Sequence, residues 1–292
     1  MKLRVMLLIA CAMLVSCQKD SPQETYFETS PTSPAEQPAE IKWSVANGGS
    51  EVVGKVLKEL PRAPANTPEV PDGMCADYVM SPKTAAGEHV ANLGWHVREE
   101  IAKNDMTYVS FFSQSTGGTS GNCDIHDGNV AVFDGDQFIA DIYASKKSKQ
   151  PLGTILDGKQ IRIYGSSVVG TPMADVSVDR TKKLITIRNI PDVELSCNGK
   201  VKVPNIHDME ISNARKKLKQ FGWLPSDMSE EADDFGMVKA MADAGHKEYS
   251  SCSGTGFGFC NLEYYNGENG MTVTTYGEES ATVNAYEVHC AK

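Results

Sequence analysis

The sequence lacks the short motifs that mark several classes of enzyme and metalloprotein. It has no G-x-x-x-x-G-K-[ST] phosphate loop, no G-x-S-x-G nucleophile turn and no H-E-x-x-H motif. It also has no C-x2-C pair, and its six histidines are not at zinc-ligand spacing from the cysteines. We therefore predict a protein that is not an enzyme, with no catalytic residue, no bound metal and no cofactor.

Positive charge is also scarce. The chain has 28 Lys and Arg residues against 38 Asp and Glu residues, for a net charge of −10. This balance argues against DNA or RNA as a partner, because phosphate repels such a surface. A basic protein or a cationic ligand fits better.

The N-terminus indicates export. Two basic residues in MKLR precede the apolar run VMLLIACAMLV, which is too short to cross a membrane and is typical of a signal peptide over residues 1–16. The next motif, LVSC at residues 14–17, resembles the bacterial lipobox. That resemblance implies cleavage before Cys17 and acylation of its thiol, and Gln18 implies sorting to the outer membrane. The alternative is an ordinary cleaved signal. We expect a periplasmic lipoprotein on the inner leaflet of the outer membrane.

Residues 17–40 have the composition of a tether. QKDSPQETYFETSPTSPAEQPAE has four prolines and many Ser, Thr, Glu and Gln residues, and therefore little apolar surface to bury. We predict that this segment is disordered and holds a folded body away from the membrane.

Six cysteines remain after the signal peptide and Cys17: Cys75, Cys123, Cys197, Cys252, Cys260 and Cys290. An even number in an exported chain predicts three disulfides, although a metal site is the rival interpretation.

We predict an α+β fold with two disulfide-stabilised lobes, 41–200 and 201–292, because about 250 residues exceed one small core. Residues 50–60 have the apolar spacing of a short amphipathic helix. A second helix should begin with Ser81 as N-cap and Pro82 in its first turn, and end at Gly94. Antiparallel strands are expected around the apolar segments between residues 95 and 190.

The second lobe has a similar pattern. Asp208 is predicted to cap a helix that carries Ile211, Ala214, Leu218 and Phe221 and ends at Gly222. Ser229 is predicted to cap another helix extending to about Ala244. Three strands around residues 257–265, 271–277 and 282–290 complete the lobe.

The two lobes have the appearance of an ancient duplication. Gly94-Trp95 and Gly222-Trp223 each follow an alanine at the same spacing, and each half then has a glycine-rich run ending in cysteine. A duplication would pair Cys75 with Cys123, Cys197 with Cys260, and Cys252 with Cys290. An alternative for the second lobe is Cys252–Cys260 with Cys197–Cys290.

Two other motifs contain residue types that occur at ligand and metal sites. The run CSGTGFGFC at 252–260 has alternating glycines between two cysteines but no helix start to receive an anion, so we interpret it as scaffold. GNCDIHDGN brings Asp124, His126 and Asp127 near Asp134 and Asp136, but it lacks the calcium-loop frame. Hairpin turns are the favoured interpretation of these acids.

VPNIHDMEISNARKKLKQFGW, residues 203–223, resembles the opening of a PASTA module, a helix-plus-three-strand unit of envelope proteins that meet peptidoglycan. From Val203 to Trp223 the resemblance implies a similar start to the fold, although the later strand pattern of that family is missing. The tethered, acidic, disulfide-bonded architecture also resembles the immunity lipoproteins of bacteria that kill rivals through type IV secretion.

The functional hypothesis is a non-catalytic inhibitor or immunity protein that occludes a basic, cell-wall-degrading effector. The alternative is a module that binds peptidoglycan or assists envelope assembly. The acidic run DMSEEADD gives candidate partner-binding residues: Asp227, Glu230, Glu231, Asp233 and Asp234. Its competing interpretation is a helix start, where acidic side chains complement the macrodipole.

Overall fold

The computed structural model describes residues 42–49, 51–69, 71, 73–118, 123–166, 170–230, 236–253, 256–277 and 281–292. The signal peptide, Cys17 and the tether, all predicted above, lie outside these residues. So does the segment 231–235, which contains three of the predicted partner-binding residues. The described residues belong to one compact unit, 41–292. No helix among them is long and apolar enough to cross a membrane.

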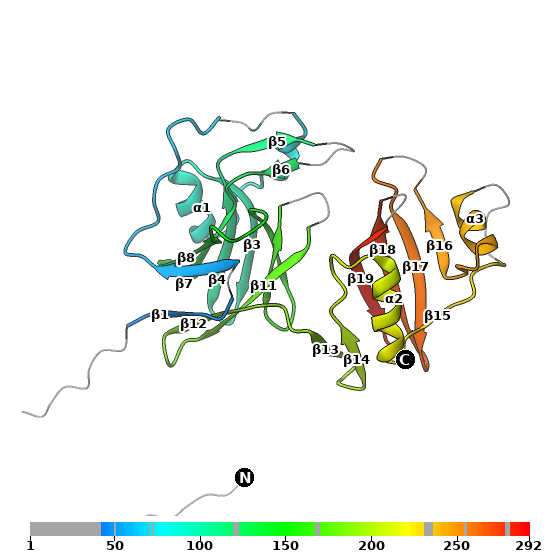
Figure 1. Ribbon diagram of the computed structural model, residues 1–292. Helices are drawn as coiled ribbons and strands as arrows, with labels where there is room; N and C mark the ends of the chain where they lie inside the picture. Colours follow the sequence, from blue (N-terminus) through cyan, green and yellow to red (C-terminus); the bar gives the residue numbers. More distant parts are fainter. Residues whose placement is uncertain are drawn as a thin grey trace, which may run out of the picture. The chain divides into compact units, whose positions relative to one another are not determined.

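Two five-stranded sheets form the N-terminal part of the fold (Figure 1). One has the order β2–β8–β7–β4–β3, with bounds Val52–Val56, Gln137–Ala144, Asn129–Asp134, Met106–Phe112 and His96–Lys103. The other has the order β1–β12–β11–β10–β9, with bounds Ser44–Asn47, Leu184–Arg188, Pro172–Asp179, Ile161–Gly165 and Leu152–Asp157. Neighbouring strands are antiparallel except for β1 and β12, which are parallel. Strands contain more residues than helices, so the α+β mixture is mainly β-sheet.

Strand β7 shows how the core is built. Val130 and Val132 pack in the cluster shared with the other five-stranded sheet, whereas Ala131 and Phe133 pack with the helix α1 (Ala85–Asn92). Successive side chains of a strand point to opposite faces of the sheet, and here both faces are covered. Burial of both faces of this strand explains why the run NVAVF is apolar throughout.

The start of α1 differs from the prediction of a Ser81 cap followed by Pro82. Thr84 is the N-cap, and its side chain accepts a hydrogen bond from the amide of Gly87 (3.0 Å). The Thr84 hydroxyl also donates to the carboxylate of Glu100 on β3. This contact with the sheet fixes the helix start, and local cap preferences could not reveal it. Gly94, with φ +89°, follows the helix in the left-handed conformation that was predicted.

Residues 50–60 do not form the predicted helix. Residues 52–56 are strand β2, which pairs with β8 along its whole length. The apolar spacing fits either structure, and pairing with β8 decides between them. Gly54 also meets the other sheet so closely that a Cβ would lie 2.7 Å from Cδ1 of Ile187. Space between the two sheets is therefore tight at this strand.

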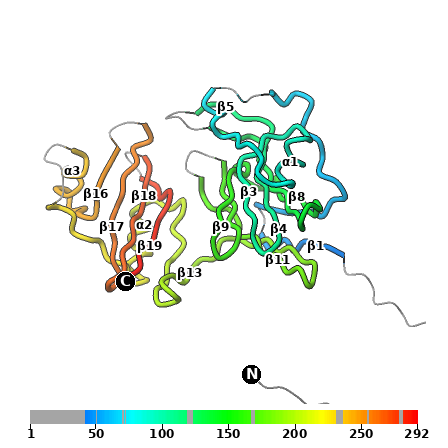
Figure 2. Tube along the Cα trace, turned by 180° about the vertical axis from the view of Figure 1, so that it is seen from behind, coloured from blue at the N-terminus to red at the C-terminus, as the bar shows by residue number. Residues whose placement is uncertain are grey.

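A third sheet organises the C-terminal part. Its strand order is β15–β17–β18–β19, with bounds Leu224–Pro225, Cys260–Asn266, Asn269–Tyr276 and Thr282–His289, while β16 (Tyr249–Cys252) also pairs with β17. Helix α2 (Ile211–Gln220) lies along one face of this sheet in both views (Figures 1 and 2). Its predicted stripe is confirmed, since Ile211, Ala214 and Leu218 are buried in the same cluster as Trp223.

Two predicted helix starts in this part are wrong. Asp208 is not the cap of α2; it has φ +60° and its amide donates to the carbonyl of Val283, and the N-cap position is taken by Glu210. Ser229 does not cap the next helix, because α3 spans only Met237–Asp243 and follows Gly236. The segments before the two helices make contacts that a local cap pattern does not include. Asp208 meets β19, and the amide of Met228 donates to the carbonyl of Lys247.

The cysteines of the described residues form three disulfides: Cys75–Cys123, Cys197–Cys290 and Cys252–Cys260. Three disulfides were predicted, and so was the first pairing. The pairings of Cys197 with Cys260 and of Cys252 with Cys290, which a duplication implied, are wrong. Cys252 and Cys260 face each other on β16 and β17, so antiparallel pairing brings them together. Cys197 lies instead in the turn between β13 (Val193–Ser196) and β14 (Val201–Pro204).

Asp141 on β8 gives the fold a pH dependence that can be measured. Burial raises the pKa of its carboxyl to about 7, against a hydrogen bond from the amide of Ile142. The folded state therefore binds this proton more tightly than the unfolded state. This contribution to stability is fully present below about pH 3.8 and is lost as the pH rises to 7.

We expect Asp141→Asn to stabilise the protein by up to about 4 kcal/mol at pH 8, because the asparagine amide is neutral at every pH whereas the buried carboxyl is ionised at pH 8. At pH 4 the variant and the parent should unfold alike. Urea unfolding at both pH values measures the difference. An equal change at the two values would show that the carboxyl does not titrate differently on folding.

Candidate functional site

The predicted acidic segment is only partly described. Asp227 and Glu230 precede α3 and lie in a loop, and Glu231, Asp233 and Asp234 are outside the described residues. Hydrogen bonds from Ser229 and Lys247 lower the pKa of Asp227 to about 2. Since α3 begins only at Met237, Asp227 and Glu230 do not occupy its first turn, and the helix-start interpretation does not explain them. Their role in partner binding stays a prediction.

The acids that resembled part of a calcium loop have other contacts. Asp127 accepts hydrogen bonds from the amides of Ser113 and Gln114, and Asp134 pairs with Arg180 (2.6 Å). Within the described ranges, no group of three or more His, Cys, Asp or Glu side chains is placed to hold a metal ion. These carboxylates therefore brace the turns and strands around them.

The glycine-rich run closes the β16–β17 hairpin. The Cys252–Cys260 disulfide joins its two strands, and the amide of Ser253 donates to the carbonyl of Phe259 (2.7 Å). Gly256 and Gly258 have φ values of +78° and +62°, which glycine tolerates without a steric penalty. Gly254 lies outside the described residues. What is described of the run serves as a covalently closed turn.

A more informative feature is the short hairpin formed by β13 and β14. The two strands pair antiparallel from Val193↔Pro204 to Ser196↔Val201. Cys197 and Asn198 hold left-handed conformations in the turn, with φ +52° and +57°. The Cys197–Cys290 disulfide ties that turn to the chain end just beyond β19. The hairpin is therefore held both by hydrogen bonds and by a covalent cross-link.

This hairpin exposes apolar side chains. Leu195 is 66% exposed and Val193 is 37% exposed, and Leu156 on β9 is 49% exposed. All three line one groove of about 460 Å³. Single exposed apolar residues are ordinary, but a group gathered around a groove and rimmed by charged residues is typical of a surface that binds something. We define these three residues as the apolar rim.

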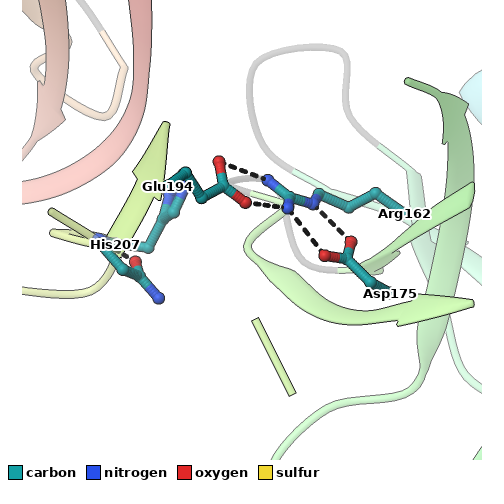
Figure 3. Close-up of polar contacts among 5 residues, drawn as sticks. Arg162, Asp175, Glu194 and His207 are labelled. Atoms are coloured by element: carbon teal, nitrogen blue, oxygen red, sulfur yellow. Dashed lines mark hydrogen bonds and ion pairs between the residues drawn. The ribbon is translucent and has the colours of Figure 1, made fainter. Parts of the chain in front are cut away.

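An ion cluster connects the hairpin to the sheet behind it (Figure 3). Arg162 on β10 lies directly opposite Asp175 on β11 and binds it through Nε (2.8 Å) and Nη2 (2.9 Å). The same guanidinium donates to the carboxylate of Glu194 on β13. The Asp175 side chain is only 8% exposed, and its hydrogen bonds raise the pKa of Arg162, so the cation stays charged. The cluster places Glu194 and, through it, the hairpin.

Beyond Glu194 a second groove of about 340 Å³ runs between β13 and β19. His207 and Tyr286 form its inner wall, with ring centroids 4.5 Å apart. Nδ1 of His207 donates to the carbonyl of Asn284 (2.9 Å), and burial lowers the pKa of His207. The imidazole is thus neutral at physiological pH, and burial raises the pKa of Tyr286.

The signal for this site in the amino-acid sequence is weak. In VELS, residues 193–196, apolar and polar residues alternate, as in any half-buried strand. Here the pattern is inverted relative to burial, because Val193 and Leu195 point outward and Glu194 meets Arg162. Arg162 and Asp175 are 13 residues apart, so no local motif joins them. Among the residues predicted from the sequence, Cys197 lies at this site, and its disulfide with Cys290 cross-links the hairpin.

The grooves, the apolar rim and the ion cluster together make a surface suited to noncovalent binding. Comparisons of this chain with protein-family models, with curated proteins and with solved structures found no match.

Proposed function

We propose that this protein is a non-catalytic binding protein that occludes a partner protein through the β13–β14 hairpin. The observation that carries the proposal is the apolar rim: Val193 and Leu195 lie on a hairpin fixed by the Cys197–Cys290 disulfide, and Leu156 on β9 lines the same groove. Apolar side chains gathered around one groove gain free energy when a partner removes them from water. A hairpin already fixed in shape loses little conformational entropy on binding.

The partner that fits best is a basic enzyme acting on the cell envelope. Residues 41–292 carry 33 acidic and 25 basic residues, a net charge of −8. Opposite charge speeds encounter, while a few apolar anchors set the lifetime of the complex. The predicted lipid anchor at Cys17 and the tether would hold this body in the periplasm, where such an enzyme acts. The protein would then serve as an inhibitor or immunity protein.

Leu195→Asp should weaken the complex at least ~10-fold, because a carboxylate would replace the most exposed apolar side chain of the rim. The soluble body 41–292 would first be used to isolate a hydrolase from the proteins secreted by the same cells. Inhibition of the purified hydrolase on peptidoglycan then gives the affinity of each variant.

Leu224→Asp is the matched control. Leu224 is 39% exposed, lies on β15 at the opposite edge of the sheet from β19, and lines neither groove. The Leu224→Asp variant should inhibit the hydrolase as strongly as the parent protein does. Equal loss in both variants, or a hydrolase whose activity the body leaves unchanged, would contradict the proposal.

We also infer that the body consists of two lobes that descend from a common ancestor, 41–200 and 201–292 as predicted, with the β13–β14 hairpin spanning the boundary between them. In support, α1 is followed by β3, β4, β7 and β8, which are neighbours in chain order, and α2 is followed by β15, β17, β18 and β19 in the same way. Each helix ends at a left-handed glycine followed by tryptophan, Gly94-Trp95 and Gly222-Trp223. The sheet β1–β12–β11–β10–β9 would then be an addition to the first lobe. The differing disulfides would be later acquisitions.

A second candidate function is binding to peptidoglycan. It is favoured by α2 packed on the three consecutive strands β17, β18 and β19, the composition of the module that residues 203–223 resemble. Sedimentation of the body with purified peptidoglycan separates the two candidates. A wall-binding module pellets with the polymer in the absence of any other protein, and an inhibitor stays in solution.

A further inference from the structure

The two five-stranded sheets leave a pocket of about 510 Å³ between them, beside the β3–β4 and β9–β10 turns. Its floor consists of buried side chains that the sheets turn toward each other: Met106 and Tyr108 on β4, Ile161 on β10 and Val176 on β11. A pocket of this size with an apolar floor is typical of sites for small molecules.

This pocket is distinct from the surface at the β13–β14 hairpin. Ile161 and Val176 point between the sheets, whereas Arg162 and Asp175, their neighbours in the chain, point to the opposite face, where they bind each other. The β9–β10 turn borders both places through Lys159. The pocket therefore offers a second site, beyond the proposed function.

Two ion pairs join the sheets at the rim of the pocket. Nζ of Lys103 on β3 lies 2.5 Å from the carboxylate of Asp157 on β9. Arg180, just after β11, lies 2.6 Å from the carboxylate of Asp134 on β7. Each pair connects one sheet to the other, so the rim is held in place on two sides.

The remaining charged residues of the lining do not favour a charged ligand. Asp179 binds its neighbour Lys182 (3.1 Å), and Lys159 is exposed to water on the turn. A charged group that enters an apolar pocket loses its hydration, and here it gains no buried partner of opposite charge among the described residues of the lining. A neutral molecule therefore fits better.

Tyr108 supplies a polar group to the apolar floor. The residue is only 3% exposed, yet its hydroxyl has no hydrogen-bond partner in the part of the chain that the structure describes. Burial, with a smaller contribution from the carboxylate of Asp157, raises the pKa of Tyr108 to about 12. The hydroxyl therefore keeps its proton and is available as a donor. A buried hydroxyl is costly to leave unpaired, and an acceptor on a ligand would pair it.

We infer that this pocket binds a small neutral molecule that combines an apolar ring with an oxygen acceptor. The ring packs on Met106, Ile161 and Val176, and the hydroxyl of Tyr108 donates to the acceptor. Sheets packed face to face lie ~10 Å apart, so a flat ring fits between them where the side chains leave room. Aromatic ketones belong to this class.

Three compounds of one size test the inference: acetophenone, cumene and benzoate. Acetophenone has the ring and the acceptor, cumene lacks the acceptor, and benzoate adds a negative charge. Titration of the body 41–292, followed by amide chemical shifts, should show acetophenone binding at least ~3-fold more tightly than either of the others. The shifted amides should lie in residues 106–108, 160–161 and 176–178.

Tyr108→Phe should lower the affinity for acetophenone to that for cumene and leave cumene binding unchanged. Its urea unfolding should match that of the parent, since the hydroxyl has no partner in the described protein to lose. Lys159→Ala is the matched control on the rim and should leave acetophenone binding intact.

Equal binding of acetophenone and cumene by the parent protein would overturn the inference, because the hydroxyl of Tyr108 would then have no role. Unshifted pocket amides would also overturn it, since the pocket would then hold only water. Tightest binding of benzoate, lost in Lys159→Ala, would identify an anion site instead. These comparisons on the parent protein are decisive even if Tyr108→Phe fails to fold.

Discussion

Replacing both Cys197 and Cys290 by serine is expected to lower the free energy of unfolding by about 4.7 kcal/mol, the largest loss for any of the three disulfides. This bridge spans 93 residues, against 48 for Cys75–Cys123 and 8 for Cys252–Cys260. Cross-linking distant residues removes more conformations from the unfolded chain than cross-linking near ones. The corresponding losses are about 4 and about 2.5 kcal/mol.

Urea unfolding under oxidising conditions measures the three losses, one double-serine variant at a time. The Cys252/Cys260 variant is the control, because it also removes two sulfur atoms but opens a much shorter loop. Loss of the Cys197–Cys290 bridge should also weaken partner inhibition, since the turn of the β13–β14 hairpin would no longer be tied to the chain end. Equal destabilisation by all three variants would contradict the loop-length argument for this protein.

Trp223→Ala is expected to destabilise the protein by about 3–5 kcal/mol. Trp223 is completely buried among the side chains that α2 and the β17–β19 sheet share. Its indole Nε1 donates to the carbonyl of Lys202 on β14, at 3.0 Å. Alanine would leave a large cavity and remove the donor that joins the hairpin to this core.

Trp95→Ala provides the comparison, because Trp95 occupies the corresponding position after Gly94. Trp95 is partly exposed, packs edge-on against Phe111 with ring centroids 4.9 Å apart, and donates to the carbonyl of Pro61. Less of its surface leaves water on folding, so its replacement should cost less. Urea unfolding of both variants, with the parent's m-value as a check on two-state behaviour, decides the order. A larger loss at Trp95 would contradict the burial argument.

Local sequence patterns correctly predicted the features that depend only on residues within the same helix. Gly94 and Gly222, with φ +89° and +82°, both end their helices in the left-handed conformation that few other residues tolerate. The buried stripe of α2 follows from apolar residues spaced by one helical turn. These features depend on neighbours within a few residues, and a short stretch of sequence contains all the information they need.

Helix boundaries and one strand depended on contacts between distant residues. The start of α1 is set by Glu100, which lies on β3. Residues 52–56 became a strand because β8, more than 80 residues later, offered an edge to pair with. A periodicity that fits both helix and strand cannot choose between them, and the sheet makes the choice.

By itself, the sequence determined that the chain is acidic, and it predicted that six cysteines form disulfides and that apolar stripes and alternations form helices and antiparallel strands. The tertiary structure alone decided which cysteines pair, because pairing depends on strand register and on where a turn meets a chain end. The tertiary structure also determined which residues lie together at the candidate site. Leu156, Arg162, Asp175, Glu194 and Leu195 are unremarkable in their own segments, and they form a candidate binding surface only because β9, β10, β11 and β13 bring them to one groove. Charge and apolar area act through space, so chain order alone does not reveal where they gather.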